Sequence, residues 1–140
     1  MNAAMYLVDK SALTRMGAAP SVRDVIAPLI IKRRAATCAV INLEMLYSAQ
    51  SPDHYEQLEA TLVHLRHLAM SEAIMQRAIE IQSSLAAKSQ HRGVSLPDLM
   101  VAACAERHEA TVLHYDGDYD RIAAITGQPV QWVVPSGTVA

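Results

Sequence analysis

The stretch of sequence that decides the fold runs from residue 96 to residue 118 and reads LPDLMVAACAERHEATVLHYDGD. Its first half predicts a helix over Leu96–Arg107, because apolar residues recur on one side and Pro97 falls in the first turn. Its second half predicts a strand over Thr111–His114, which is followed by the turn signal Asp116-Gly117. A helix that leads directly into a buried strand is typical of α/β proteins.

The same alternation of strands and helices continues outward from this stretch in both directions, which predicts an α/β fold with a small central parallel sheet flanked by helices. Further strands are predicted at Met5–Val8, Ala36–Val40, His67–Ala69 and Val130–Val134. Further helices are predicted after a cap at Ser11, over Val22–Ile30, from Asn42 onward, over Tyr55–Leu68, over Glu72–Ser89 with a cap at Ser71, and over Asp118–Ile125.

The composition predicts one cytoplasmic domain over residues 1–140. A mass of 15.3 kDa suits a single compact core, and 51% apolar with 19% charged residues excludes a disordered chain. No apolar run reaches the length of a membrane helix, and Asp9 interrupts the N-terminal segment where a signal peptide would be apolar. Cys38 and Cys104 lack metal-type spacing and are interpreted as small buried residues of a reducing compartment.

The charge balance disfavours binding of nucleic acid through a bulk positive field. The net charge is −2 and the isoelectric point about 6.3, so a polyanion would need a local basic patch or bound metal ions. The cluster Lys32-Arg33-Arg34 is a candidate patch, but the favoured interpretation is the solvated end of a helix. Lys10 and Arg15 are better placed, near Asp9, to contact a substrate.

Acidic residues follow several predicted strands, at Asp9, Glu44, Asp98, Asp116 and Asp118. Glu44 is expected four residues after its strand, in the first turn of a helix. Taken singly, each acid is more simply a cap or turn residue, and Ser95-Leu96-Pro97-Asp98 matches a capping box. Because the carboxyl ends of parallel strands meet at one edge of the sheet, the five acids together predict a shared site.

Converging carboxylates predict a bound cation. Two carboxylates about 5 Å apart repel by roughly 3 kcal/mol at an effective dielectric of 20. Oxygen-only ligands suit Mg²⁺ or Mn²⁺, which can activate water and stabilise in-line displacement at phosphorus. His64 and His67 lie three residues apart without a third soft ligand nearby, so a metal site there is not expected.

Four motifs resemble those of the PIN-domain family, and their length and order most resemble VapC-type toxins of toxin–antitoxin pairs. The motifs are Tyr6–Leu13, Asn42-Leu43-Glu44, Leu96–Ala103 and Val112–Tyr119. The resemblance implies a metal-dependent endoribonuclease with a metal-binding quartet at Asp9, Glu44, Asp98 and Asp116, an accessory acid at Asp118, and a small hydroxyl residue at Ser11. It also implies a homodimer and a VapB-type antitoxin partner. Lys10, His114 and Tyr119 depart from the family pattern, which usually has Thr or Ser, Thr, and Phe at these positions.

The hypothesis from the sequence is therefore a Mg²⁺- or Mn²⁺-dependent nuclease that cleaves single-stranded or loop RNA as the toxin of such a pair. An alternative is a catalytically silent PIN-like module that binds RNA or a protein, although the intact quartet argues against it. A phosphoacceptor receiver domain lacks the acid pair expected after its first strand, because Lys10 follows Asp9. A DNA nuclease stays open, since the same metal chemistry cuts either polymer.

Overall fold

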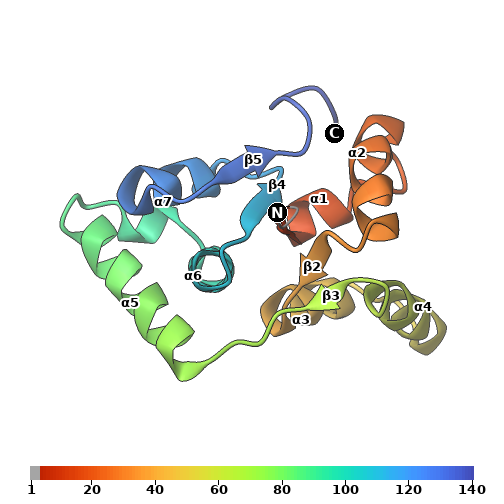
Figure 1. Cartoon of the computed structure of the whole chain (residues 1–140), viewed down its shortest axis with the longest axis horizontal. Coiled ribbons are helices and arrows are strands. Elements are labelled where there is room, and N and C mark those ends of the chain that lie inside the picture. Colours follow the sequence, from red (N-terminus) through yellow and green to blue (C-terminus); the bar gives the residue numbers. More distant parts are fainter. Residues whose placement is uncertain (1–3) are drawn as a thin grey trace.

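A parallel five-stranded sheet forms the centre of the molecule in the computed structural model, which describes residues 4–140 (Figure 1). The strand order is β3-β2-β1-β4-β5. The strands are β1 (Tyr6–Val8), β2 (Ala35–Thr37), β3 (Arg66–His67), β4 (Thr111–His114) and β5 (Val130–Trp132). The central strand β1 pairs in parallel with β2 on one side and with β4 on the other. Because the strands run in the same direction, the residues that follow β1 and β4 lie at the same edge of the sheet.

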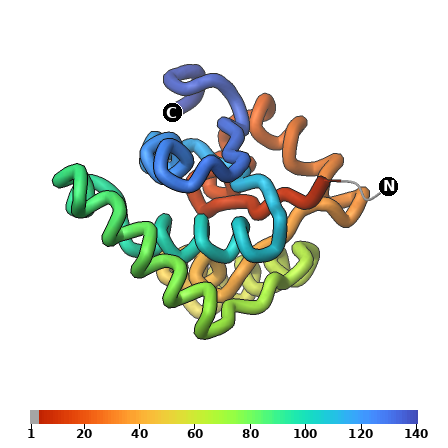
Figure 2. Tube along the Cα trace, turned by 60° about the vertical axis from the view of Figure 1, so that its left-hand side comes forward, coloured from red at the N-terminus to blue at the C-terminus, as the bar shows by residue number. Residues whose placement is uncertain are grey.

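Helices surround this sheet and link consecutive strands. They are α1 (Lys10–Leu13), α2 (Pro20–Ile31), α3 (Ala39–Tyr47), α4 (Pro52–Leu62), α5 (Glu72–Ala86), the 3₁₀ turn η1 (His91–Gly93), α6 (Leu96–Arg107) and α7 (Asp118–Thr126). Helix α5 runs along one side of the molecule and packs against α6 and α7 (Figure 2). Helix α3 packs against α4 and α6, and α2 packs against β2. The chain after β5 returns to α1, where the Arg15 Nε donates a hydrogen bond of 2.9 Å to the Ala140 carbonyl.

The central strands are apolar in sequence because their side chains are buried on both faces of the sheet. All three residues of β2 are buried, and so are Leu7 and Val8 of β1 and the last three residues of β4. Strands of a parallel sheet are covered on both faces, so neither set of alternating side chains needs to be polar. Helix α6 is buried along Val101–Ala105, which fits its position between the sheet and α5.

The fold class predicted from the sequence is confirmed, and α6 and β4 have the predicted bounds. The prediction for Ala36–Val40 is wrong at its end: β2 stops at Thr37, Cys38 is the N-cap, and α3 starts at Ala39 instead of Asn42. The reason is that the apolar run continues from the strand into the buried side of the helix, so hydrophobicity alone does not mark the boundary.

Other differences concern the ends of elements. Helix α4 begins at Pro52, three residues before the predicted start, and ends at Leu62 instead of Leu68. Helix α5 ends at Ala86 instead of Ser89. Strands β3 and β5 end earlier than predicted, at His67 and Trp132. The cap at Ser71 is confirmed, because its hydroxyl accepts from the Ile74 amide at 3.2 Å. Within the described residues, no helix combines the length and apolar character needed to cross a membrane.

Candidate metal centre

Asp9 is the buried carboxylate that follows β1, and local backbone geometry fixes its orientation. It is the N-cap of α1, and its Oδ2 accepts hydrogen bonds from the Ser11 amide at 3.1 Å and the Ser11 hydroxyl at 2.7 Å. The sequence analysis assigned the capping role to Ser11 itself, which is wrong because Ser11 lies inside the helix. The Ser11 hydroxyl instead links Asp9 to the end of β4, where it accepts from the Tyr115 amide at 2.8 Å.

Asp98 is buried in the first turn of α6 and is the most perturbed acid of the site. The Ser95 hydroxyl caps α6 by accepting from the Asp98 amide at 3.4 Å, but the Asp98 carboxylate does not return the bond as a capping box requires. Instead, the Ser95 amide donates to Asp118 Oδ2 at 3.1 Å. Burial, followed by the charges of Asp9 and Asp116, raises the pKa of Asp98 to about 9.

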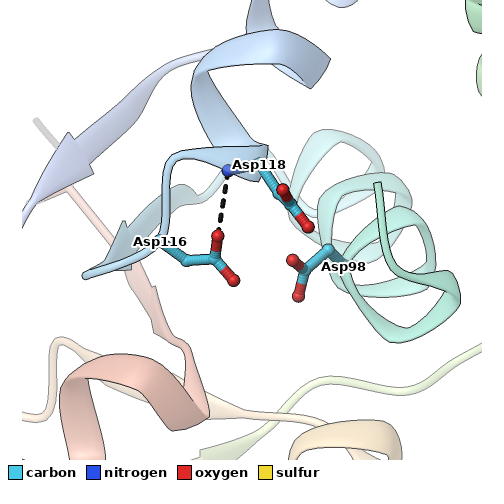
Figure 3. Close-up of side chains that lie close together, drawn as sticks. All are labelled: Asp98, Asp116 and Asp118. Carbon is cyan, nitrogen blue, oxygen red and sulfur yellow. Dashed lines mark hydrogen bonds between the residues drawn. The ribbon is translucent and has the colours of Figure 1, made fainter. Parts of the chain in front are cut away.

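Asp116 and Asp118 follow β4 and lie next to Asp98 (Figure 3). The Asp118 amide donates to Asp116 Oδ1 at 2.9 Å, which turns the chain into α7 after the N-cap Gly117. One carboxylate oxygen from each of Asp98, Asp116 and Asp118 lies within 4.8 Å of the others. Two segments that are distant in sequence therefore bring three acids to one point.

Glu44 lies at the margin of this cluster. Because α3 starts at Ala39, Glu44 is in the second turn of the helix, which corrects the expected first-turn position. Its carboxylate is 4.0 Å from the Lys10 Nζ, so Lys10 pairs with an acid of the site. Burial and the charges of Asp9 and Asp116 raise the pKa of Glu44, while Lys10 lowers it. Glu44 is thus close enough to sense the other acids but does not belong to the compact group of three.

Tyr119 is a functional residue of the site that sequence reasoning did not single out. Its side chain is fully buried, and its hydroxyl lies 2.8 Å from Asp9 Oδ1 and 3.2 Å from Asp98 Oδ1. Burial and these two acids raise the pKa of Tyr119 well above its usual value, so the hydroxyl keeps its proton and acts as a donor. The only signal in the sequence is the departure from the Phe that the family usually has at this position.

His114 is a buried residue at the end of β4 that contacts both Asp116 and Tyr119. Its Nδ1 accepts from the Asp116 amide at 3.1 Å, and its ring packs 4.9 Å from the Tyr119 ring. Burial lowers the pKa of His114, and a ring nitrogen that accepts an amide proton is itself unprotonated. The geometry therefore favours a structural role for His114, ordering the end of β4, over proton donation.

The donor set fits a divalent cation. Asp98 Oδ2 is buried and has no hydrogen-bond partner among the described residues, although an isolated buried carboxylate oxygen is costly. Hard cations such as Mg²⁺ and Mn²⁺ prefer carboxylate oxygens, and an ion here would offset the repulsion that raises the pKa of Asp98. Within residues 4–140, His64 and His67 belong to no comparable group.

The sheet topology and the acids at its carboxyl edge define a class of protein, a small parallel α/β fold with an acidic cluster suited to a divalent cation. The sequence profile described as PIN domain matches residues 6–125. Two curated proteins of Mycobacterium tuberculosis are similar along almost their whole length. Ribonuclease VapC51 (strain ATCC 25618 / H37Rv) is 42% identical over 134 residues, covering 96% of each chain. Ribonuclease VapC21 (strain CDC 1551 / Oshkosh) is 43% identical over 134 residues, covering 95% of this chain and 96% of the relative.

The chain therefore belongs to the PIN domain family and, within it, to the VapC group. Among solved structures, the DNA-bound VapBC of Salmonella typhimurium has a similar fold, with a TM-score of 0.78 over 94% of this chain and 100% of that chain at 16% identity. VapBC-5 of Mycobacterium tuberculosis superimposes with a TM-score of 0.61 over 93% of this chain and 97% of that chain at 24% identity. At these identities the likeness concerns the fold.

Proposed function

We propose that this protein is a metal-dependent endoribonuclease that cleaves single-stranded or loop RNA as the toxin of a toxin–antitoxin pair. The observation that carries the proposal is the grouping of Asp98, Asp116 and Asp118, together with an Asp98 Oδ2 that has no hydrogen-bond partner among the described residues. RNA is the proposed substrate because the relatives VapC51 and VapC21 are both named ribonucleases. A cytoplasmic location is part of this proposal, and the proposed RNA substrate supports it.

The proposed ion is Mg²⁺ or Mn²⁺, held by Asp98, Asp116, Asp9 and Glu44 directly or through water. When bound, such an ion supplies positive charge that polarises the phosphate and lowers the pKa of a coordinated water. Tyr119 and Ser11 fix the orientation of Asp9, and Asp118 is the accessory acid that orients water at the edge of the cluster. Lys10 balances part of the charge of Glu44.

Cleavage of total cellular RNA by the purified protein tests this function. Wild-type protein with Mn²⁺ is expected to yield fragments with 5′-phosphate and 3′-hydroxyl ends, and EDTA is expected to abolish them. Asp98→Asn keeps the size of the side chain but removes a metal ligand, so the cleavage rate should fall by at least about a hundredfold. The matched control is Asp24→Asn, which neutralises an exposed acid on α2 and should cleave at the wild-type rate.

Retention of wild-type cleavage by Asp98→Asn would show that the assigned centre is wrong. RNA binding that needs no metal and leads to no cleavage would instead favour the silent binding module. Cleavage of single-stranded DNA at the same rate as RNA would contradict RNA specificity.

The proposed protein partners are a VapB-type antitoxin and a second copy of this chain. Several solved neighbours of this fold are described as VapBC or toxin–antitoxin complexes, which supports an antitoxin partner. Helices α3 and α4 expose apolar side chains that suit an antitoxin segment: Leu43 is 69% exposed, Tyr47 92% and Val63 76%. This face also borders the acid cluster, because Glu44 lies on α3. Light scattering should give twice 15.3 kDa if the chain dimerises.

A further inference from the structure

A basic hollow lies at the opposite edge of the sheet from the acids. It has a volume of about 920 Å³ and opens where the amino ends of the strands meet. The side chains that give it charge come from separate segments, namely Lys32, Arg33, Arg34, Arg66 and His108, with Glu109 as its acid. The turn after α2 is attached to β1 at this edge, since the Tyr6 amide donates to the Arg34 carbonyl at 2.8 Å.

Three of the cations in the basic hollow are free to bind an anion. Lys32, Arg33 and Arg66 are exposed, and none of them takes part in an ion pair with the described residues. Arg34 has a structural role, because its Nε donates to the Ala4 carbonyl at 2.9 Å and its guanidinium lies over the Tyr6 ring. The sequence favoured a solvated helix end for the Lys32-Arg33-Arg34 cluster, since the contribution of Arg66 from β3 becomes visible only in the fold.

Arg33 is held at a backbone position that suits glycine. The Arg33 amide bonds to the Ile30 carbonyl at 3.0 Å and the Arg34 amide to the Leu29 carbonyl at 2.8 Å, which closes α2 in a Schellman motif. The residue after the C-cap is left-handed in this motif, and Arg33 has φ 56°. Glycine adopts this conformation without steric cost, whereas arginine pays for it. Ser89 and Glu109 adopt the same left-handed conformation, so what sets Arg33 apart is that its cation lies in the basic hollow.

We propose that the basic hollow binds the phosphate backbone of the single-stranded RNA whose scissile bond lies at the acid cluster. This inference rests on the proposed ribonuclease function. Met5 at the hollow and Asp9 at the cluster are four residues apart along extended backbone, or about 13 Å at 3.3 Å per residue. Leu7 and Val8 of β1 are buried, so an RNA that contacts both edges follows a longer path over the surface and spans it with several nucleotides. The hollow then supplies positive charge for part of the RNA backbone in a protein of net charge −2, while the scissile phosphate lies at the acids.

Binding of a labelled single-stranded 20-nucleotide RNA in EDTA, measured by fluorescence anisotropy, separates this proposal from catalysis. The double variant Arg33→Gly/Arg66→Gln removes two phosphate contacts, and each should cost about fivefold in affinity at 0.1 M salt, following the 0.7 exponent for single strands. The slope of log affinity against log salt should fall in parallel. Because glycine suits the left-handed position, Arg33→Gly should also raise the melting temperature, so lost binding cannot be attributed to unfolding.

Glu109→Gly is the matched control, because Glu109 occupies the equivalent left-handed position after α6, with φ 56°, and lines the same hollow. It should tighten RNA binding, whereas Arg33→Gly weakens it. Lys88→Gln removes an exposed cation from the end of α5, outside the hollow, and should leave affinity unchanged.

Wild-type affinity and salt slope in the double variant would overturn the proposal, as would a shift of Arg33→Gly and Glu109→Gly in the same direction. Weakened binding of an acidic peptide with unchanged RNA binding would also overturn it and identify the hollow as a protein site. Cleavage of a short RNA with Mn²⁺ provides the separate readout of the proposed function. A protein that cleaves this RNA normally but fails the binding test keeps its ribonuclease function and loses the basic hollow as an RNA site.

Discussion

Tyr119 joins two carboxylates that would otherwise repel each other. Its single hydroxyl proton faces Asp9 at 2.8 Å and Asp98 at 3.2 Å, while Asp98 Oδ2 has no partner among the described residues. The phenol therefore holds one oxygen of each acid and leaves the other oxygen of Asp98 for a ligand. A hydrogen bond that orients a metal ligand commonly changes metal affinity by 10–100-fold, so Tyr119 matters even though it is not itself expected to bind the ion.

Tyr119→Phe should weaken Mn²⁺ binding by about tenfold or more, and it should cost about 1 kcal/mol of folding free energy for the lost buried hydrogen bond. Calorimetric titration with Mn²⁺ measures the first effect and thermal unfolding in EDTA the second. Tyr115→Phe is the control, because the Tyr115 hydroxyl bonds to the chain near Gly137 and Val139, away from the acids. Equal Mn²⁺ affinities in the two variants would refute a positioning role for Tyr119.

At the residue scale, the sequence indicates which acids matter better than it indicates what surrounds them. All five acids could be selected because each follows or begins a predicted element at the carboxyl edge. The spacing along the chain cannot show that Asp98, Asp116 and Asp118 form the compact group while Glu44 stays beside Lys10. Nor can it show that the Tyr119 hydroxyl reaches Asp9, a contact between residues 110 positions apart. The identity of the metal ligands stays a prediction.

At the element scale, helix α3 shows why an apolar sequence pattern does not locate the boundary between a strand and a helix. The sequence pattern places Ala39 and Val40, the first two residues of α3, in a strand, because they extend the apolar run of β2 and hydrophobicity does not distinguish a buried strand from a buried helix start. Helix α6 and strand β4 were predicted with the correct bounds, because Ser95, Pro97 and the Asp116-Gly117 turn mark their ends. Cap and turn residues therefore predict the ends of helices and strands better than hydrophobicity does.

The exposed face of α3 gives a prediction about the antitoxin. Leu43→Ser/Tyr47→Ser removes two apolar side chains that are 69% and 92% exposed, so the fold should tolerate both changes. If these side chains anchor an antitoxin segment, its affinity should fall by about 30-fold or more, the loss typical of one anchor residue worth 2 kcal/mol. Binding is measured with a purified VapB-type antitoxin, the partner proposed above. Ile79→Ser on α5, which is 58% exposed, is the control, and equal losses in both variants would contradict the assignment to α3.

At the scale of the whole molecule, the sheet separates charge of opposite sign. Acids gather after β1 and β4, and the basic hollow lies before β1, β2, β3 and β4. A net charge of −2 hides this division, because composition sums over both edges. The acid cluster stores unfavourable free energy in the metal-free protein, since burial and neighbouring charges raise the pKa of Asp98 to about 9. Stability, pH and metal binding are therefore linked through one residue.

The sign of this linkage follows from the two states of Asp98. The pKa of an aspartate is about 3.9 in an unfolded chain, so between pH 4 and pH 9 the folded protein binds a proton that the unfolded chain has lost. The contribution of Asp98 to stability is complete below pH 4 and is lost as the pH rises toward 9. Relative to Asp98→Asn, wild-type protein in EDTA should lose stability with rising pH, by up to about 1.4 kcal/mol per pH unit.

Unfolding followed by far-ultraviolet circular dichroism and by the fluorescence of Trp132 tests the link between pH and stability through Asp98. The same experiment tests the proposal that residues 1–140 form one domain. Trp132 is the single tryptophan and lies in β5, so coincident transitions from both probes would report one cooperative unit. The proposed site exists only in the folded chain, so Mn²⁺ should raise the melting temperature of wild-type protein, more at pH 8 than at pH 6, and have little effect on Asp98→Asn. Two separate transitions would refute the single domain. Parallel pH profiles of wild-type and Asp98→Asn in EDTA would refute the strained carboxylate and, with it, the physical reason for expecting a cation at this edge of the sheet.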